Sequence, residues 1–327
     1  MPEERARPTV TANMRSSRIA VLDAPSNLGL RPPSLGVAPG CYKLARAVNN
    51  RIVERLGAED AGCVTPPRHD RHEWAPGQGV ANASGLAHYT TRLADRVSSL
   101  LRAGKFPLLL GGDCSILLGA ALAMRRQVRF GVAFLDGHSA FRHGGNSPNV
   151  GSAAGEDLAL VTGRGQVDLT DLEGLSPYID DSDVVVMGVR SDDEHLDEMR
   201  EVGISVWTVG DLGSEESETV PAAGLLRLEN RDLDGFWIHL DVDVLDPELM
   251  PAVDSPAAGG LDIDELVTIL GSLLASPRSV GLDVTVFDPD LDPEGRLAVR
   301  LTDSLVASFS RGLAVDDEPV RPPRQIR

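Results

Sequence analysis

Two aspartates that lie two positions apart are the first residues whose types and spacing point to chemistry. Asp241 and Asp243 follow the apolar run Phe236-Trp237-Ile238, which has the composition of a buried strand. Residues two apart on a strand face the same side of the sheet, so both carboxylates should project together from the strand end. Two such carboxylates repel each other unless a cation or a proton lies between them. The pair therefore predicts a site for a hard divalent ion, and a solvated acidic turn is the alternative.

A second pair has the same spacing, and a third stretch adds a thiol. Asp136 and His138 follow the strand predicted over residues 128–135, and an oxygen offered beside an imidazole suits a divalent metal. The stretch Gly111-Gly112-Asp113-Cys114 predicts a tight turn from a strand into a helix, with Cys114 at the sheet edge. Taken alone, this cysteine is more typical of a packed small residue than of a metal ligand.

The elements that must position these side chains alternate between strands and helices. Further strands are predicted over residues 19–23, 106–110, 183–188, 204–209, 236–241 and 280–286, and helices over residues 41–56, 85–103, 116–124, 157–162, 225–231, 263–275 and 297–310. This alternation predicts an α/β fold with three α/β/α layers and a mostly parallel central sheet. In such sheets the functional site lies outside the carboxyl ends of the strands, where all three stretches fall.

The domain organisation is predicted to be simple. A single domain spans residues 18–312, between a disordered leader at 1–17 and a polar, proline-rich tail at 313–327. Residues 57–83 are interpreted as a surface excursion, and the small, glycine-rich residues 144–155 as an active-site lid. His69 and His72 in the excursion have a spacing that suits a metal, although their polar flanks with proline make this the weaker interpretation.

The composition excludes several classes of protein. The chain has 327 residues, of which 42% are hydrophobic and 24% are charged, as in ordinary globular proteins. A formal net charge of -18 argues against a nucleic-acid partner and against an anionic membrane surface. We find no apolar run near the roughly 18 residues of a membrane span, and no signal-peptide core. Three cysteines without a C-x-x-C spacing indicate a reducing compartment, so we expect a cytoplasmic protein.

In this order, the three stretches resemble the motifs of the ureohydrolase family, which comprises arginases, agmatinases, formiminoglutamases and their relatives. The family carries Gly-Gly-Asp-His, then Asp-Ala-His-x-Asp, then Asp-x-Asp followed by Asp-Pro. The matching stretches here are Gly111-Gly112-Asp113-Cys114, Asp136-Gly137-His138-Ser139-Ala140 and Asp241-Val242-Asp243 with Asp246-Pro247. The resemblance spans roughly residues 19–310, and it includes a glycine-rich loop at 29–40 and the stretches at 259–261 and 281–283.

The resemblance implies an arginase-like fold, a homo-oligomer (a trimer or a hexamer) and a small-molecule substrate. It also implies two Mn²⁺ ions, which activate a water for attack on a guanidinium or amidine carbon. On the family pattern the metal ligands are Asp136, His138, Asp241 and Asp243, with Cys114 where the family has a histidine. Asp136 and Asp241 would bridge the two ions, and Asp136, His138 and Asp241 would hold the reacting water.

Two departures from the family pattern fall on one ion of the pair. Cys114 replaces a histidine, and a thiolate would shift the metal preference from Mn²⁺ toward Zn²⁺ or Fe²⁺. Ala140 replaces an aspartate, and alanine cannot ligate. The second metal site is therefore predicted to be degraded, whereas the ligands of the first are complete.

Two further departures fall on the substrate chemistry. Val286 stands where the family has the glutamate that receives the guanidinium, and Gly151 stands where arginases have a proton-shuttling histidine. His143 and Glu156 lie in the same loop as Gly151 and are candidate catalytic substitutes.

These residues favour a metal-dependent hydrolase that cleaves a C–N bond of a small amidine, guanidino or ureido-type substrate. The alternative is a non-catalytic protein of the ureohydrolase fold that binds a ligand or a partner, and the missing ligands favour it. A third, weaker hypothesis makes Cys114 a nucleophile at a helix N-terminus, with His138 as its base.

Overall fold

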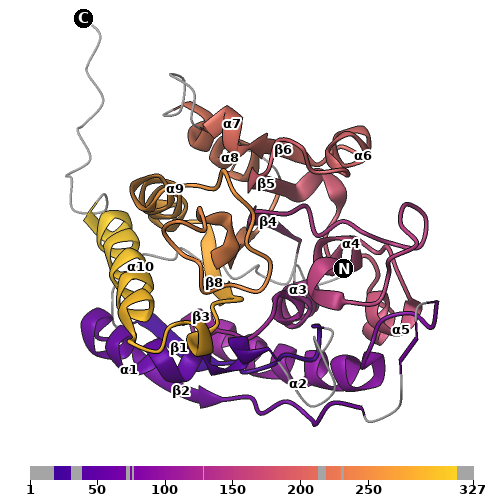
Figure 1. Cartoon of the computed structure of the whole chain (residues 1–327), viewed down its shortest axis with the longest axis horizontal. Coiled ribbons are helices and arrows are strands. Elements are labelled where there is room, and N and C mark those ends of the chain that lie inside the picture. The colour runs from indigo at the N-terminus through magenta and orange to yellow at the C-terminus, as the bar shows by residue number, and fades with distance from the viewer. Residues whose placement is uncertain are drawn as a thin grey trace, which may run out of the picture.

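A single parallel sheet forms the centre of the protein. The computed structural model describes residues 18–30, 39–70, 74–75, 77–127, 129–212, 219–229 and 232–314. Within these residues, eight strands pair in the order β2-β1-β3-β8-β7-β4-β5-β6, and every pair is parallel (Figure 1). The strands are β1 (Ile19–Asp23), β2 (Glu59–Cys63), β3 (Phe106–Leu110), β4 (Phe130–Leu135), β5 (Val184–Val189), β6 (Ser205–Thr208), β7 (Gly235–Asp241) and β8 (Ser279–Thr285).

Helices cover both faces of this sheet (Figure 1). One face carries α1 (Leu44–Leu56), α7 (Val209–Leu212), α8 (Thr219–Glu229), α9 (Ile263–Ala275) and α10 (Arg296–Ala314). The other face carries α2 (Ala83–Arg102), α3 (Leu117–Arg125), α4 (Asp157–Val161), α5 (Val167–Thr170) and α6 (Leu196–Glu201). Alternating side chains of the strands feed two separate cores: Ile238 and Leu240 of β7 join the first, and Trp237 joins the second. The predicted three-layer α/β/α fold is confirmed.

Short 3₁₀ turns complete the secondary structure, and two of them hold residues of the site. They are η2 (Gly40–Lys43), η3 (Cys114–Ile116), η4 (Ala153–Gly155), η5 (Leu172–Gly174), η6 (Asp181–Asp183), η7 (Val242–Val244) and η8 (Pro289–Leu291). Among the helices of the described ranges, we find none with the length and apolar character that crossing a bilayer requires.

The strand order explains why distant stretches of sequence meet. Strands β3, β8, β7 and β4 are consecutive neighbours in the middle of the sheet. All strands run the same way, so their carboxyl ends lie at one edge. Cys114 follows β3, Asp136 follows β4, and Asp241 ends β7. The three chemistry-bearing stretches therefore converge, as predicted.

One strand was not predicted. β2 pairs with β1 at the edge of the sheet, inside residues 57–83, which the sequence suggested were only a surface excursion. Its side chains are exposed except at Ala61, which is half-buried. The alternation that marks a half-buried strand is therefore missing, and a polar edge strand escapes a search for hydrophobic patterns.

Other predictions fall partly outside the described residues. The leader at 1–17 and His72 lie outside them, as do residues 31–38 of the glycine-rich loop and residues 315–327 of the tail. Helix α10 continues to Ala314, so the start of the predicted tail is helical. His69 places Nε2 at 2.8 Å from Asn27 Oδ1 and takes part in local hydrogen bonding.

Candidate metal centre

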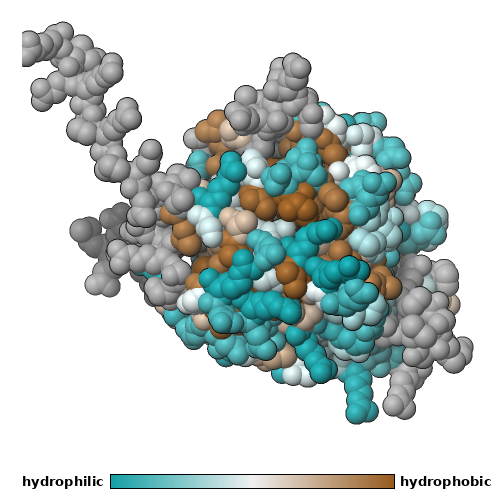
Figure 2. Space-filling model, turned by 60° about the vertical axis from the view of Figure 1, so that its left-hand side comes forward, coloured by the Kyte–Doolittle hydropathy of each residue, from teal (hydrophilic) through white to brown (hydrophobic). Residues whose placement is uncertain are grey.

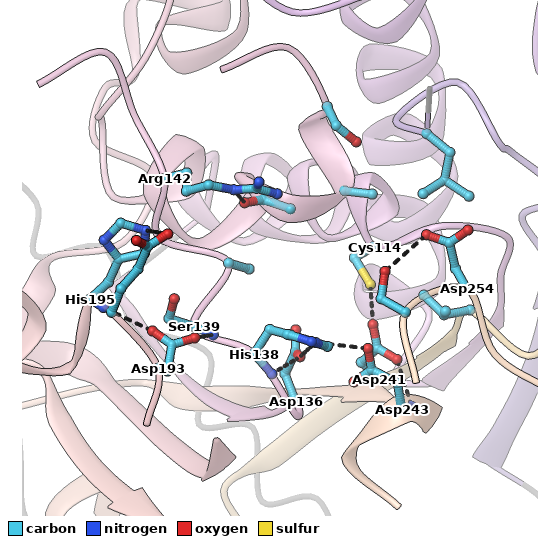
Figure 3. Close-up of a pocket in the computed structure, with 18 residues that line it drawn as sticks. Cys114, Asp136, His138, Ser139, Arg142, Asp193, His195, Asp241, Asp243 and Asp254 are labelled. Atoms are coloured by element: carbon cyan, nitrogen blue, oxygen red, sulfur yellow. Dashed lines mark hydrogen bonds and ion pairs between the residues drawn. The ribbon is translucent and has the colours of Figure 1, made fainter. Parts of the chain in front are cut away.

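A pocket of about 340 Å³ lies at the carboxyl ends of the central strands (Figure 3). All five metal ligands that the family pattern suggested line this pocket: Cys114, Asp136, His138, Asp241 and Asp243. We call Asp136, His138, Asp241 and Asp243 the pocket cluster. Its carboxylates are almost completely buried, with 2% of Asp136, 4% of Asp241 and 3% of Asp243 exposed.

The two aspartates of the Asp-x-Asp pair come together by a turn and not by strand alternation. β7 ends at Asp241, and Asp243 lies in η7 (Val242–Val244). The backbone N–H of Asp243 donates to Asp241 Oδ1 at 2.8 Å, which folds the turn back on the strand end. Both carboxylates line the pocket, although the reason differs from the predicted one.

The Asp136–His138 pair joins the same group. The backbone N–H of His138 donates to Asp136 Oδ1 at 2.6 Å, and His138 Nδ1 lies 2.9 Å from Asp243 Oδ2. The N–H of Gly137 donates to Asp243 Oδ1 at 3.1 Å. Donor atoms of Asp136, His138 and Asp243 all lie within 4.8 Å of one another, a spacing that suits a shared metal ion.

The electrostatics of the pocket cluster favour a cation. Burial, and then the negative charges of Asp243 and Asp241, raise the pKa of Asp136 well above its usual range. Burial, and then Asp243, do the same to the pKa of Asp241. The hydrogen bond to Asp243 raises the pKa of His138. Buried carboxylates crowded in this way are unfavourable when ionised, and a divalent ion would remove that penalty.

Arg190 holds the turn η7 through hydrogen bonds to its main-chain oxygens. Its guanidinium donates to the main-chain carbonyls of Asp243 at 3.0 Å, Val244 at 3.2 Å and Ala257 at 2.6 Å. Because its N–H groups bind the backbone oxygens of both segments, Arg190 fixes η7 and the following loop. The sequence analysis did not identify this residue.

Cys114 is buried and hydrogen-bonded to Asp241. It is 1% exposed, its Sγ donates to Asp241 Oδ2 at 2.8 Å, and Thr285 Oγ1 lies at 3.2 Å. Burial, and then the charge of Asp241, raise the pKa of the thiol well above its ordinary value. A nucleophilic cysteine needs a lowered pKa and a free base, but His138 Nδ1 is engaged by Asp243. The geometry argues against the nucleophile hypothesis.

The glycine pair before Cys114 lets two segments touch. A Cβ on Gly112 would lie 1.5 Å from the carbonyl oxygen of Ser26, so only glycine fits. Asp113 then caps η3 by accepting from the N–H of Ser115 at 2.8 Å and from that of Gly29 at 2.9 Å. These contacts fix where Cys114 enters the site.

Ala140 and Val286 line the pocket with unusual backbone conformations. Their φ angles are 45° and 74°, in the left-handed region that β-branched residues strongly disfavour. Such strain costs on the order of 1–3 kcal/mol per residue and gathers at functional sites. At both positions the side chains offer only methyl groups to the pocket.

The two candidate catalytic substitutes do not face the pocket in the way that was expected. His143 Nε2 lies 3.0 Å from Glu198 Oε1, and its Nδ1 accepts from the N–H of Gly145 at 3.1 Å. Glu156 Oε1 accepts from the N–H groups of Gly151 at 2.5 Å and Ser152 at 2.9 Å. Neither residue lines the pocket. Both side chains fasten the loop, and a catalytic role for either of them stays a prediction.

The structure also adds pocket residues that sequence reasoning missed. Asp193 accepts from the N–H groups of Ser139 and His195, each at 2.9 Å, and it lines the pocket together with Arg142 and Asp254 (Figure 3). These residues come from loops after different strands, so no local spacing links them.

A second group of donor atoms joins two residues of the pocket lining to one residue outside it. Cys114, Asp136 and His239 also have donor atoms within 4.8 Å of one another. His239 could have been found from the sequence, because it precedes Asp241 by two positions on the same strand and so shares its face.

Comparisons with known proteins agree with this architecture. The sequence model of the arginase family matches residues 31–310. An arginase of Bacillus caldovelox is 30% identical over 294 residues, covering 88% of this chain and 97% of the relative. An arginase of Brevibacillus brevis is 29% identical over 303 residues, covering 89% and 98%. The solved structure of the Bacillus caldovelox arginase aligns with a TM-score of 0.79 and 28% identity, covering 93% of this chain and all of that one.

Proposed function

Because this chain belongs to the arginase family, whose members are hydrolases of C–N bonds, we propose that it is a metal-dependent hydrolase of a small amidine, guanidino or ureido-type substrate. The observation that supports this most directly is the pocket cluster, in which three carboxylates and one imidazole converge on one cavity. This donor set suits Mn²⁺. A bound ion would lower the pKa of water and so provide a nucleophile at neutral pH.

Some residues of the pocket would bind the ion, and hydrogen bonds from the backbone hold these ligands in place. Asp136, His138, Asp241 and Asp243 would hold it, and the bonds from Gly137 and Asp243 N–H keep the carboxylates in place. The nearly complete burial of these carboxylates excludes bulk water, which strengthens their interaction with a cation.

Asp254 is the residue that we assign to a cationic group of the substrate. It lines the pocket near Cys114 (Figure 3), and Ser255 Oγ lies 3.3 Å from its Oδ2. Asp254 is exposed to solvent, and Val286 brings no charge to the same pocket. Asp254 would therefore provide the carboxylate that the family pattern places at position 286.

The opposite side of the pocket offers Arg142 as a cationic side chain, beside the carboxylates of Asp193 and Glu194. Arg142 and His195 lie across the pocket from Asp254 (Figure 3). A small substrate with a cationic end toward Asp254 and an acidic end toward Arg142 would complement both sides. Guanidino, amidine and ureido acids have this form.

The test is a screen of such acids with the Mn²⁺-loaded chain, measuring the release of urea, ammonia or the free amine. We expect turnover that depends on the metal and is lost in Asp243→Asn. Asp183→Asn is the control, since Asp183 is buried outside the pocket and paired with Arg129. Metal-loaded protein that turns over none of these classes would contradict the proposal.

The methyl groups of Ala140 and Val286 favour a second candidate, a non-catalytic protein that binds a small ligand. Both residues line the pocket where the family pattern has carboxylates. Calorimetric binding of a screened compound without any product would support this candidate over the hydrolase.

We also propose that the chain acts in the cytoplasm as a homo-oligomer, a trimer or a hexamer. The family resemblance supports the assembly, and a patch of apolar residues among hydrophilic ones on one face (Figure 2) is the kind of surface that subunits bury. Light scattering coupled to size exclusion would measure the mass, and a monomer would contradict the proposal.

A further inference from the structure

The donor atoms beneath the pocket form a site of their own. We propose that Cys114, Asp136 and His239, with Asp157 beside them, bind one divalent ion of borderline softness such as Zn²⁺, Co²⁺ or Fe²⁺. We call these four residues the buried cluster. Its first three members have donor atoms within 4.8 Å of one another. The site goes beyond the proposed function, because His239 and Asp157 belong to neither ion of the family pattern, and metal binding is measured without turnover.

The imidazole of His239 is oriented as that of a metal ligand. Its Nδ1 lies 2.5 Å from Asp283 Oδ2, while Asp283 Oδ1 accepts from Trp237 Nε1 at 2.5 Å. The ring stacks on Phe134 with centroids 4.6 Å apart. A carboxylate on one ring nitrogen is the usual support for a histidine that binds metal through the other. Nε2 is fully buried and has no hydrogen-bond partner among the described residues.

Asp157 meets His239 from the other side. It is the first residue of α4 and is completely buried, and neither carboxylate oxygen has a hydrogen-bond partner in the described part of the chain. Its Oδ2 lies 3.8 Å from His239 Nε2, which is too long for a hydrogen bond. Two ligands that bind one ion at about 2.0–2.2 Å lie roughly 3–4 Å apart. The separation fits a shared ion.

The charges around the cluster agree with this geometry. Burial, and then the charges of Asp136 and Asp283, raise the pKa of Asp157 well above its usual range. Asp241, Asp157 and Asp136 also raise the pKa of Cys114, after burial. Buried acidic groups left without hydrogen bonds are costly, and a divalent ion would compensate them together.

The ligand types determine which ion is expected. A thiolate and an imidazole favour Zn²⁺, Co²⁺ or Fe²⁺ over Mn²⁺, whereas the pocket cluster offers mainly oxygen. Asp136 belongs to both clusters, so the two ions would share one carboxylate. His239 and Asp157 would then replace the carboxylate ligand that the family pattern places at position 140.

The test is a Co²⁺ titration of the chelator-treated full chain. The near-ultraviolet absorption of thiolate-to-cobalt charge transfer reports an ion on Cys114, and elemental analysis gives the metal per chain. We expect the band in the wild type, its loss in Cys114→Ser, and a Co²⁺ affinity lowered more than about 100-fold in His239→Gln, because even outer-shell changes cost about 10–100-fold. His138→Gln is the matched control and should keep the band.

The outcomes decide the proposal. No band in the wild type, or an unchanged affinity in His239→Gln, would overturn it. If circular dichroism shows that His239→Gln does not fold, Asp283→Asn takes its place, with an expected loss of about 10–100-fold; an unchanged affinity there would also overturn the site. A thiolate band without any turnover would contradict the hydrolase proposal and support the metal site of the buried cluster. Turnover without the band would support the hydrolase proposal and contradict this metal site.

Discussion

The pocket cluster and the buried cluster share Asp136 but are built in different ways. The pocket cluster uses pairs of residues two positions apart, joined by short-range bonds such as Asp243 N–H to Asp241. The buried cluster takes its ligands from η3, β7 and α4, which are far apart in the chain. The difference teaches that local motifs bring one group of donor side chains together, whereas the other group depends on the packing of separate elements.

The largest effect is expected at the residue that both clusters share. Asp136→Asn should abolish Mn²⁺ and Co²⁺ binding together and lower turnover by at least about 100-fold, since a metal ion supplies several kcal/mol of transition-state stabilisation. Elemental analysis and initial rates measure both effects. Asp183→Asn, buried outside the pocket, should change neither. Retention of one metal by Asp136→Asn would show that the clusters are independent.

Metal removal should expose the repulsion within both clusters. The raised pKa values of Asp136, Asp157 and Asp241 arise first from burial, so the folded metal-free chain holds protons that the unfolded chain has released. The contribution of these three carboxyl groups to the stability of the metal-free chain is therefore fully present below the ordinary aspartate pKa, about 4, and is lost as the pH rises through the raised values.

Bound metal should reverse this trend, because protons compete with metal for the same ligands. Thermal melts between pH 5 and 8, with and without Co²⁺, would measure the difference, which we expect to widen as the pH rises. A metal-free melting temperature that rises with pH would contradict the assigned electrostatics.

A carboxylate at position 140 should raise the metal affinity of the pocket relative to that of the buried cluster. Ala140→Asp places an oxygen ligand where φ is 45°, a conformation that aspartate tolerates better than most residues. We expect Mn²⁺ affinity at a second site to rise about 10-fold, the effect of about 1.4 kcal/mol. Ala140→Asn, which has the same shape without the charge, is the control. An unchanged metal count would show that the residue at position 140 does not limit binding of a second ion.

Asp254 should affect the pocket alone. Asp254→Asn removes the charge assigned to a cationic substrate group, so KM should rise about 10-fold with a smaller change in kcat. The thiolate-to-cobalt band should stay as it is. A drop in kcat at constant KM would place Asp254 among the groups that act on the transition state.

The smallest effect is expected for the loop contact of His143. His143→Ala removes its partly buried bond to Glu198, which is worth about 0–1 kcal/mol of unfolding free energy. Denaturant titration measures that change, and turnover should stay within about 2-fold, on the order of 0.4 kcal/mol. A loss of activity much larger than the loss of stability would support a catalytic role for His143.

Local patterns were sufficient for the fold class and for the pocket cluster. Apolar runs and helical periodicity predicted the alternating elements, and α9 has the predicted bounds, with Asp262 and Glu265 in a reciprocal cap. Spacing of two predicted that Asp136 and His138 act together. The same rule would have predicted a role for His239, two positions before Asp241, because a strand fixes which side chains share a face.

Tertiary structure alone decided the rest. Asp157 of α4 lies 3.8 Å from His239 of β7, and Asp283 supports the same ring because β8 is paired with β7. Neither contact has a sequence signal, since periodicity orients side chains within one element and does not specify which elements become neighbours. The sequence by itself thus determined the motifs at the strand ends, and only the packing of strands and helices around them decided which buried groups lie beside those motifs.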